Sequence, residues 1–188
     1  MPVSMRSLLF PVTTLGFRVF HVLSIKRLRR KRNRGMIQAK DVICMKRCVI
    51  VGGAEIRTYD RVKRYFRADD FFIYCDCGLR HQAGLGAEPD LIVGDFDSHE
   101  KPETDKETIV LPVRKDDTDT VFAVKEALRR GFDEFLLVGV SGGRMDHTLV
   151  NVYLLVRLQE QGKRALLLDD YSEMELIGAE PVEIPERS

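Results

Sequence analysis

The stretch LIVGDFDS (91–98) is an apolar run that ends at Gly94 and passes directly into two aspartates, Asp95 and Asp97. The run lacks polar alternation, which is typical of a strand covered on both faces in a parallel sheet. Residues i and i+2 of an extended chain point to the same side, so both carboxylates are expected to point into one space. No helix start lies nearby to explain them as caps, and the pair favours metal or phosphate chemistry.

Similar apolar runs recur after Met45: CVIVGG (48–53), FFIYC (71–75), TIVLP (108–112), FLLVGV (135–140) and ALLLDD (165–170). Two helical patterns lie among them. DTDTVFAVKEALRRG (117–131) has an apolar face and signals for both helix ends, and DHTLVNVYLLVRLQEQG (146–162) is apolar nearly all round, which predicts a sandwiched helix. Strands alternating with helices predict an α/β fold, with an open, mostly parallel, Rossmann-like sheet flanked by helices.

Acidic residues follow several of the expected strands, and parallel strands bring such residues to one edge of the sheet, where ligands of α/β sheets bind. Clustered carboxylates repel one another unless a cation lies among them, and Mg²⁺ prefers oxygen ligands. Glycines near these acids let backbone N–H groups approach phosphates, and Arg144 adds a fork of donors. The residues concerned are Asp76, Asp95, Asp97, Asp116, Asp117, Asp119 and Asp146, with Gly52, Gly53, Gly142 and Gly143.

Some of these features also have purely structural explanations. The acids and threonine of 116–119 are favourable at the start of the helix that follows them, and Asp146 is favourable at the start of the next helix. A glycine pair after a strand is common in turns. The sequence alone leaves both interpretations open at these positions.

The net charge of +1 gives no overall attraction to nucleic acid or to membranes. Four cysteines in a narrow part of the chain (Cys44, Cys48, Cys75 and Cys77) do not form a disulfide framework, and they favour a reducing, cytoplasmic setting. CDCGLRH (75–81) lacks the second Cys/His pair that a structural zinc site needs.

Residues 1–45 have a different character from the rest. The apolar segment 7–25 is interrupted and barely long enough to span a bilayer, and its strong positive charge, KRLRRKRNR (26–34), follows it instead of preceding it as in a secretory signal. A weak membrane or surface anchor and a basic tail for anionic partners are alternatives. We favour a disordered extension over 1–45, followed by a nucleotide-binding domain over 46–170.

Three segments in this order and spacing resemble the thiamine pyrophosphokinase family: PDLIVGDFDS (89–98), KDDTDT (115–120) and GVSGGRMDHTLVNVYLL (139–155). The resemblance covers about residues 46–178. It implies Mg²⁺-dependent transfer of a pyrophosphoryl group from ATP to thiamine, giving AMP and thiamine diphosphate. It also implies a homodimer, in which an α/β domain binds the nucleotide and a C-terminal β-sandwich contributes to a thiamine site between subunits.

The resemblance also assigns roles to individual positions. The magnesium-binding and catalytic acids fall on Asp95, Asp97 and Asp119. The nucleotide contacts fall on Gly53, Asp76, Lys115, Thr118, Gly143 and Arg144, and the thiamine-site residues on Ser98 and Asp146.

Two departures from the family pattern stand out. Cys77 replaces a usual glycine, which would cost about 1 kcal/mol if the backbone there had positive φ. The segment 171–188 supplies about one strand of the expected sandwich. Three hypotheses follow: an active kinase, an inactive or partner-dependent ATP-binding fragment of that enzyme, and an unrelated magnesium-dependent phosphotransferase or phosphatase with Asp95 as nucleophile.

Overall fold

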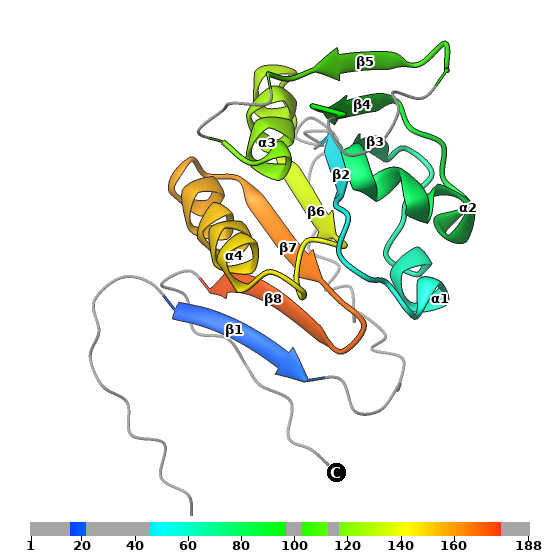
Figure 1. Cartoon of the computed structure of the whole chain (residues 1–188). Coiled ribbons are helices and arrows are strands. Elements are labelled where there is room, and N and C mark those ends of the chain that lie inside the picture. Colours follow the sequence, from blue (N-terminus) through cyan, green and yellow to red (C-terminus); the bar gives the residue numbers. More distant parts are fainter. Residues whose placement is uncertain (1–15, 22–45, 97–102, 113–116, 178–188) are drawn as a thin grey trace, which may run out of the picture.

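The computed structural model describes residues 16–21, 46–96, 103–112 and 117–177, which form one eight-stranded sheet with helices on both faces (Figure 1). The strand order is β1-β8-β7-β6-β2-β3-β4-β5. The six strands from β7 to β5 are mutually parallel, while β8 runs antiparallel to β7 and to β1. The prediction of an open, mostly parallel α/β sheet is confirmed.

All six strands expected from apolar runs are present, within a few residues of the predicted bounds. They are β2 (Arg47–Val51), β3 (Phe71–Cys75), β4 (Leu91–Gly94), β5 (Glu107–Val110), β6 (Glu134–Val138) and β7 (Arg164–Leu168). The central strands β2, β3, β4 and β6 are buried almost throughout, as unbroken apolar runs predict.

Alternate side chains of these strands enter two separate cores. On one face, Cys48 and Ile50 pack with the helices α3 (Asp119–Arg129) and α4 (Met145–Glu160). On the other face, Val49 and Val51 pack with residues of three short helices, α1 (Tyr59–Lys63), η1 (Asp76–His81) and α2 (Gln82–Leu85). These short helices were not predicted, because helices of four to six residues are too short to display a periodic pattern.

Helix α4 corrects one expectation. We expected a helix covered on all sides, yet Met145, Leu149 and Tyr153 are 71%, 61% and 58% exposed. They recur every four residues along one stripe, whereas Leu155 and Leu158 on the opposite side are buried against the sheet. A single sheet face covers one side of the helix, so the apolar residues on the other side remain exposed. None of the helices in the described ranges is long and apolar enough to cross a membrane.

The two edge strands at the β7 side differ from the expected domain division. Gly16–His21, within the segment expected to be disordered, form β1 and pair with β8 (Ser172–Ile177) over six residues. Strand β8, expected to begin a separate domain, extends the α/β sheet through its pairing with β7. The expectation of disorder therefore does not hold for these six residues. The remainder of 1–45, with the basic run 26–34, lies outside the described residues.

Candidate active site

A cleft of about 680 Å³ opens at the carboxyl edge of the parallel strands, lined by residues that follow β2, β3, β4 and β6 and by the first turn of α3. This is the edge at which the acids were predicted to gather. Because the strand order places β2, β3, β4 and β6 side by side, loops that are distant in the sequence meet there.

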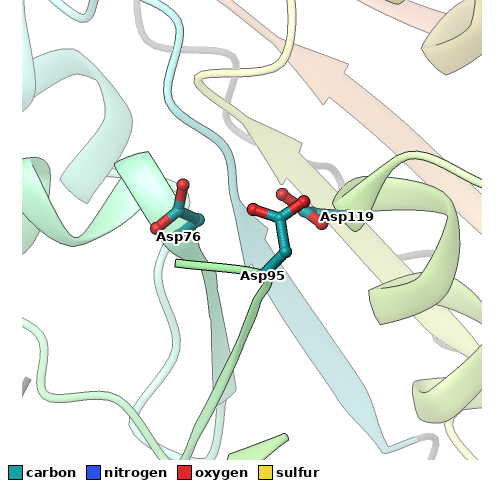
Figure 2. Close-up of side chains that lie close together, drawn as sticks. All are labelled: Asp76, Asp95 and Asp119. Carbon is teal, nitrogen blue, oxygen red and sulfur yellow. The ribbon is translucent and has the colours of Figure 1, made fainter. Parts of the chain in front are cut away.

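Three carboxylates meet in this cleft: Asp76, Asp95 and Asp119 (Figure 2). One oxygen from each lies within 4.8 Å of the others, and all three residues are half-buried. Figure 2 shows the side chains converging from η1, from the segment after β4 and from the start of α3. Three negative charges in so small a volume favour a bound cation.

The donor set of this cluster suits magnesium. It consists of carboxylate oxygens without imidazole, and magnesium takes oxygen ligands at about 2.0–2.1 Å while retaining several waters. Oxygens bound to one such ion lie at most about 4.2 Å apart, so small side-chain adjustments would bring these three oxygens to ligating separations. The half-buried position leaves room for waters or for phosphate oxygens to complete the coordination.

Local backbone structure explains how each acid reaches the cluster. Asp76 begins η1 directly after β3, and Asp95 directly follows β4. Asp119 is the first residue of α3, whose N-cap Thr118 accepts a hydrogen bond from the backbone N–H of Val121 at 3.3 Å. Capping and site formation therefore coexist here: Thr118 caps the helix, and Asp119 both occupies its first turn and reaches the cluster.

The argument that Asp95 and Asp97 share one side assumed an extended chain between them, and that assumption is wrong. Phe96 has φ of +51°, a left-handed conformation uncommon for a residue with a side chain. The alternation of the strand ends there, so it no longer fixes the side of the next residue. Asp97 itself lies outside the described residues.

Close backbone approaches shape the floor of the cleft. A Cβ on Gly52 would lie 2.5 Å from the carbonyl oxygen of Gly139, and one on Gly139, at φ of +61°, would lie 2.6 Å from that of Gly52. The segments that follow β2 and β6 are also joined by a hydrogen bond from the N–H of Ala54 to the Gly139 carbonyl, at 2.8 Å. These glycines bring the two segments into direct backbone contact.

The loop before α4 contributes open glycines and an ion pair. Gly142 and Gly143 have φ of +95° and +67°, and a Cβ on either would meet nothing within 4 Å. Arg144 donates to Asp146 through Nη2 at 2.5 Å and through Nε at 3.2 Å. These hydrogen bonds lower the pKa of Asp146 to about 2, so Asp146 is ionised at neutral pH.

The structure brings most of the predicted site residues together. Seven of them line the cleft: Gly53, Asp76, Asp95, Thr118, Asp119, Gly143 and Arg144. Asp146 is tied to the cleft through Arg144. Asp97, Ser98 and Lys115 lie outside the described residues.

Sequence reasoning did not assign site roles to several polar lining residues, among them Arg80 and Asn151. Asn151 is buried, and its Nδ2 donates to the Val140 carbonyl at 2.7 Å, which holds the loop that carries the open glycines. A basic residue four positions after Asp76 was the available signal for Arg80. Cys77 also lines the cleft. Its φ is not positive, so the conformational strain considered for a side chain at this position does not arise.

Buried His81 joins three segments around the cleft. Its Nε2 lies 2.9 Å from the Ala54 carbonyl, and its Nδ1 lies 2.9 Å from the hydroxyl of Tyr59. A carbonyl only accepts, so Nε2 carries the proton and Nδ1 accepts from Tyr59. Burial lowers the pKa of His81 below its ordinary value of 6.5, which keeps the ring neutral.

Acidification is therefore expected to destabilise the fold through His81. As the pH falls through 6.5, His81 becomes protonated in the unfolded chain but stays neutral in the folded chain, because its folded pKa is lower. The free energy of unfolding is therefore highest above pH 6.5 and decreases as the pH falls towards the folded pKa. The melting temperature, followed from pH 8 to 5.5, should fall. A His81→Gln variant, which keeps a donor and an acceptor, should show a flatter dependence of the melting temperature on pH. Equal slopes for His81→Gln and wild type would contradict this assignment.

Comparison with known proteins gives a consistent family. The profile of the family "Thiamin pyrophosphokinase, catalytic domain" matches residues 62–167, more than half of the chain. The thiamine pyrophosphokinase of Bacillus subtilis is 29% identical over 138 residues, covering 70% of this chain and 64% of that protein.

Solved structures agree with the sequence match. The crystal structure of the B. subtilis thiamine pyrophosphokinase superposes with a TM-score of 0.57 at 26% identity, over 66% of this chain and 61% of that one. A thiamin pyrophosphokinase family protein from Enterococcus faecalis gives 0.53 at 31% identity, over 66% and 62%. The chain thus spans somewhat less than two thirds of the length of these relatives.

Proposed function

The chain belongs to the thiamin pyrophosphokinase catalytic-domain family, and from this premise we propose that it catalyses transfer of the pyrophosphoryl group of ATP to thiamine, giving AMP and thiamine diphosphate. The observation that carries the proposal is the convergence of Asp76, Asp95 and Asp119 in a cleft bordered by glycine-rich loops. Polyphosphate chemistry needs both features: oxygen ligands for a divalent cation, and backbone close enough to cradle phosphates.

In this proposal the residues of the cleft divide between cation, nucleotide and thiamine. The three described acids, together with Asp97, would hold Mg²⁺, which would supply neutralisation of the charge that develops on the phosphates. Gly53, Thr118 and Gly143 border the space for the nucleotide, together with Arg144. The family resemblance adds Lys115, which lies outside the described residues, to the nucleotide contacts. Asp146 orients Arg144 through their ion pair, and Ser98 and Asp146 serve the thiamine side.

Catalysis by such a site is mainly positioning and electrostatic stabilisation. The clustered carboxylates fix the place of the cation relative to the loops, and the close contact between the segments after β2 and β6 fixes those loops relative to each other. The residues then hold the transferred group in line with the incoming hydroxyl of thiamine.

The direct test is to incubate the purified chain with ATP, MgCl₂ and thiamine, and to quantify AMP and thiamine diphosphate together. Equimolar formation of both products is expected. Formation of AMP without thiamine diphosphate would overturn the proposal, and so would formation of ADP instead of AMP. A trapped aspartyl-phosphate would instead favour the phosphatase-type alternative, against which the family match already argues.

A second candidate function is ATP binding without turnover. It is favoured by coverage, since the match spans 64% of the length of the B. subtilis enzyme. Magnesium-dependent ATP binding without AMP formation would support this alternative. The reducing setting indicated by the number and spacing of the cysteines in the sequence fits the cytoplasmic location that we propose for either function.

We also propose that two copies of the chain associate through the exposed stripe of α4. A Leu149→Glu substitution places a charge in the centre of this stripe and should weaken self-association about tenfold or more, as judged by sedimentation velocity. Gln159→Glu, at an exposed polar position of the same helix, should leave it unchanged. A wild-type chain that sediments as a monomer at micromolar concentration would count against the stripe as an interface.

A further inference from the structure

Two arginines line the described part of the cleft, and they differ in what holds them. Arg144 is bound to the carboxylate of Asp146 through two nitrogens, so its charge is largely balanced within the protein. Arg80 donates through Nε to the neutral carbonyl of Cys77 at 2.8 Å. In the described structure, Arg80 is therefore the cleft arginine whose positive charge is not balanced by a bound carboxylate.

The position of Arg80 is set by the turn that carries Asp76. Both residues belong to η1, and the Nε bond folds the Arg80 side chain back over this turn. Its Nη2 lies 3.4 Å from the place where a Cβ on Gly53 would stand, so the guanidinium overlies the segment after β2. The two terminal nitrogens carry four of the five guanidinium donors. Arg80 and Gly53 both line the cleft, and the absence of a side chain at Gly53 makes room for Cys77 and for the Arg80 guanidinium.

On this basis we propose that Arg80 binds phosphate oxygens of the nucleotide, on the Gly53 side of the cleft. The proposal rests on the proposed function, because it assigns a further contact to the same polyphosphate substrate. A magnesium ion at the three acids neutralises only part of the charge of ATP, and a guanidinium fork is well suited to the remaining phosphate oxygens. Helix η1 then supplies a contact to each part of MgATP, with Asp76 for the magnesium ion and Arg80 for the phosphates.

Binding measurements with phosphate-bearing and phosphate-free ligands test the assignment. The affinity of MgATP is measured by calorimetry, and that of adenosine by competition, for wild type, Arg80→Met, Arg80→Lys and the control Arg157→Met. Arg157 pairs with Glu160 on the exposed side of α4 and does not line the cleft. Arg80→Met should bind MgATP about tenfold more weakly or worse, Arg80→Lys should be intermediate, and adenosine affinity should be unchanged.

The outcomes separate this inference from the function beneath it. A wild-type chain that binds no MgATP overturns both. Wild-type binding together with an Arg80→Met affinity within twofold overturns only the role of Arg80. Equal weakening of MgATP and adenosine would also overturn it, since a phosphate contact affects only the phosphorylated ligand. Melting of each variant without ligand shows whether a loss of affinity reflects a loss of fold.

Discussion

Replacing Asp95 by asparagine is expected to lower kcat/KM for thiamine diphosphate formation by about 10³-fold. The substitution keeps the size of the side chain and removes one of the three charges that converge in the cleft. A neutral amide is a poor ligand for magnesium in a site built of carboxylates, and the stabilisation that the ion gives to the phosphates should be largely lost. The rate is followed through AMP and thiamine diphosphate at saturating magnesium.

The same variant carries an independent readout. The melting temperature of the free variant, measured beside that of wild type, shows whether Asp95→Asn keeps its fold. A ligand stabilises only the state that binds it, so the rise in melting temperature produced by MgCl₂ in wild type should shrink in Asp95→Asn. Asp133→Asn is the matched control, because Asp133 pairs with Lys163 next to the amino end of β6, at the opposite edge of the sheet. Activity within tenfold of wild type in Asp95→Asn would contradict the role of the cluster.

The sheet could be predicted because its signal is local. Unbroken apolar runs such as 71–75 and 91–94 are nearly fully buried strands. A strand that is buried on both faces has apolar residues at successive positions, and this pattern is visible in the sequence. Parallel pairing then brings the acids that follow these strands to one edge, which is why Asp76, Asp95 and Asp119 could be named before their distances were known. The apolar pattern of α4 was equally clear, but the pattern alone does not say how many sides of a helix the rest of the fold covers.

The remaining features depend on contacts between distant segments. Arg80 reaches the cleft because η1 folds it over Gly53, 27 positions earlier in the chain, and His81 ties the same turn to Ala54 and Tyr59. The left-handed Phe96 has no composition signal, since glycine or asparagine would be the usual residue in such a conformation. Strand β1 was missed because its partner, β8, lies about 150 residues away.

Replacing Gly78 by alanine is expected to destabilise the fold by about 3 kcal/mol and to remove nucleotide binding with it. A Cβ at this position would lie 2.2 Å from the carbonyl oxygen of Val51, far inside van der Waals contact, and 3.1 Å from that of Gly52. Neither obstacle is the end of a flexible side chain, so β2 and η1 would have to separate. Asp76, two residues before Gly78, would then move away from Asp95 and Asp119.

Gly131→Ala is the matched comparison, because it separates crowding from backbone conformation. Gly131 follows the end of α3 with φ of +83°, and a Cβ there would meet nothing within 4 Å, so alanine should cost only about 1 kcal/mol of conformational strain. Urea denaturation gives the free energy of unfolding of both variants, and the difference between them measures the contact between η1 and β2. If Gly78→Ala proved no less stable than Gly131→Ala, close packing of the two segments would not be what requires glycine at position 78. If Gly78→Ala remained folded and bound MgATP as well as wild type, η1 would not be positioning Asp76 for the cation.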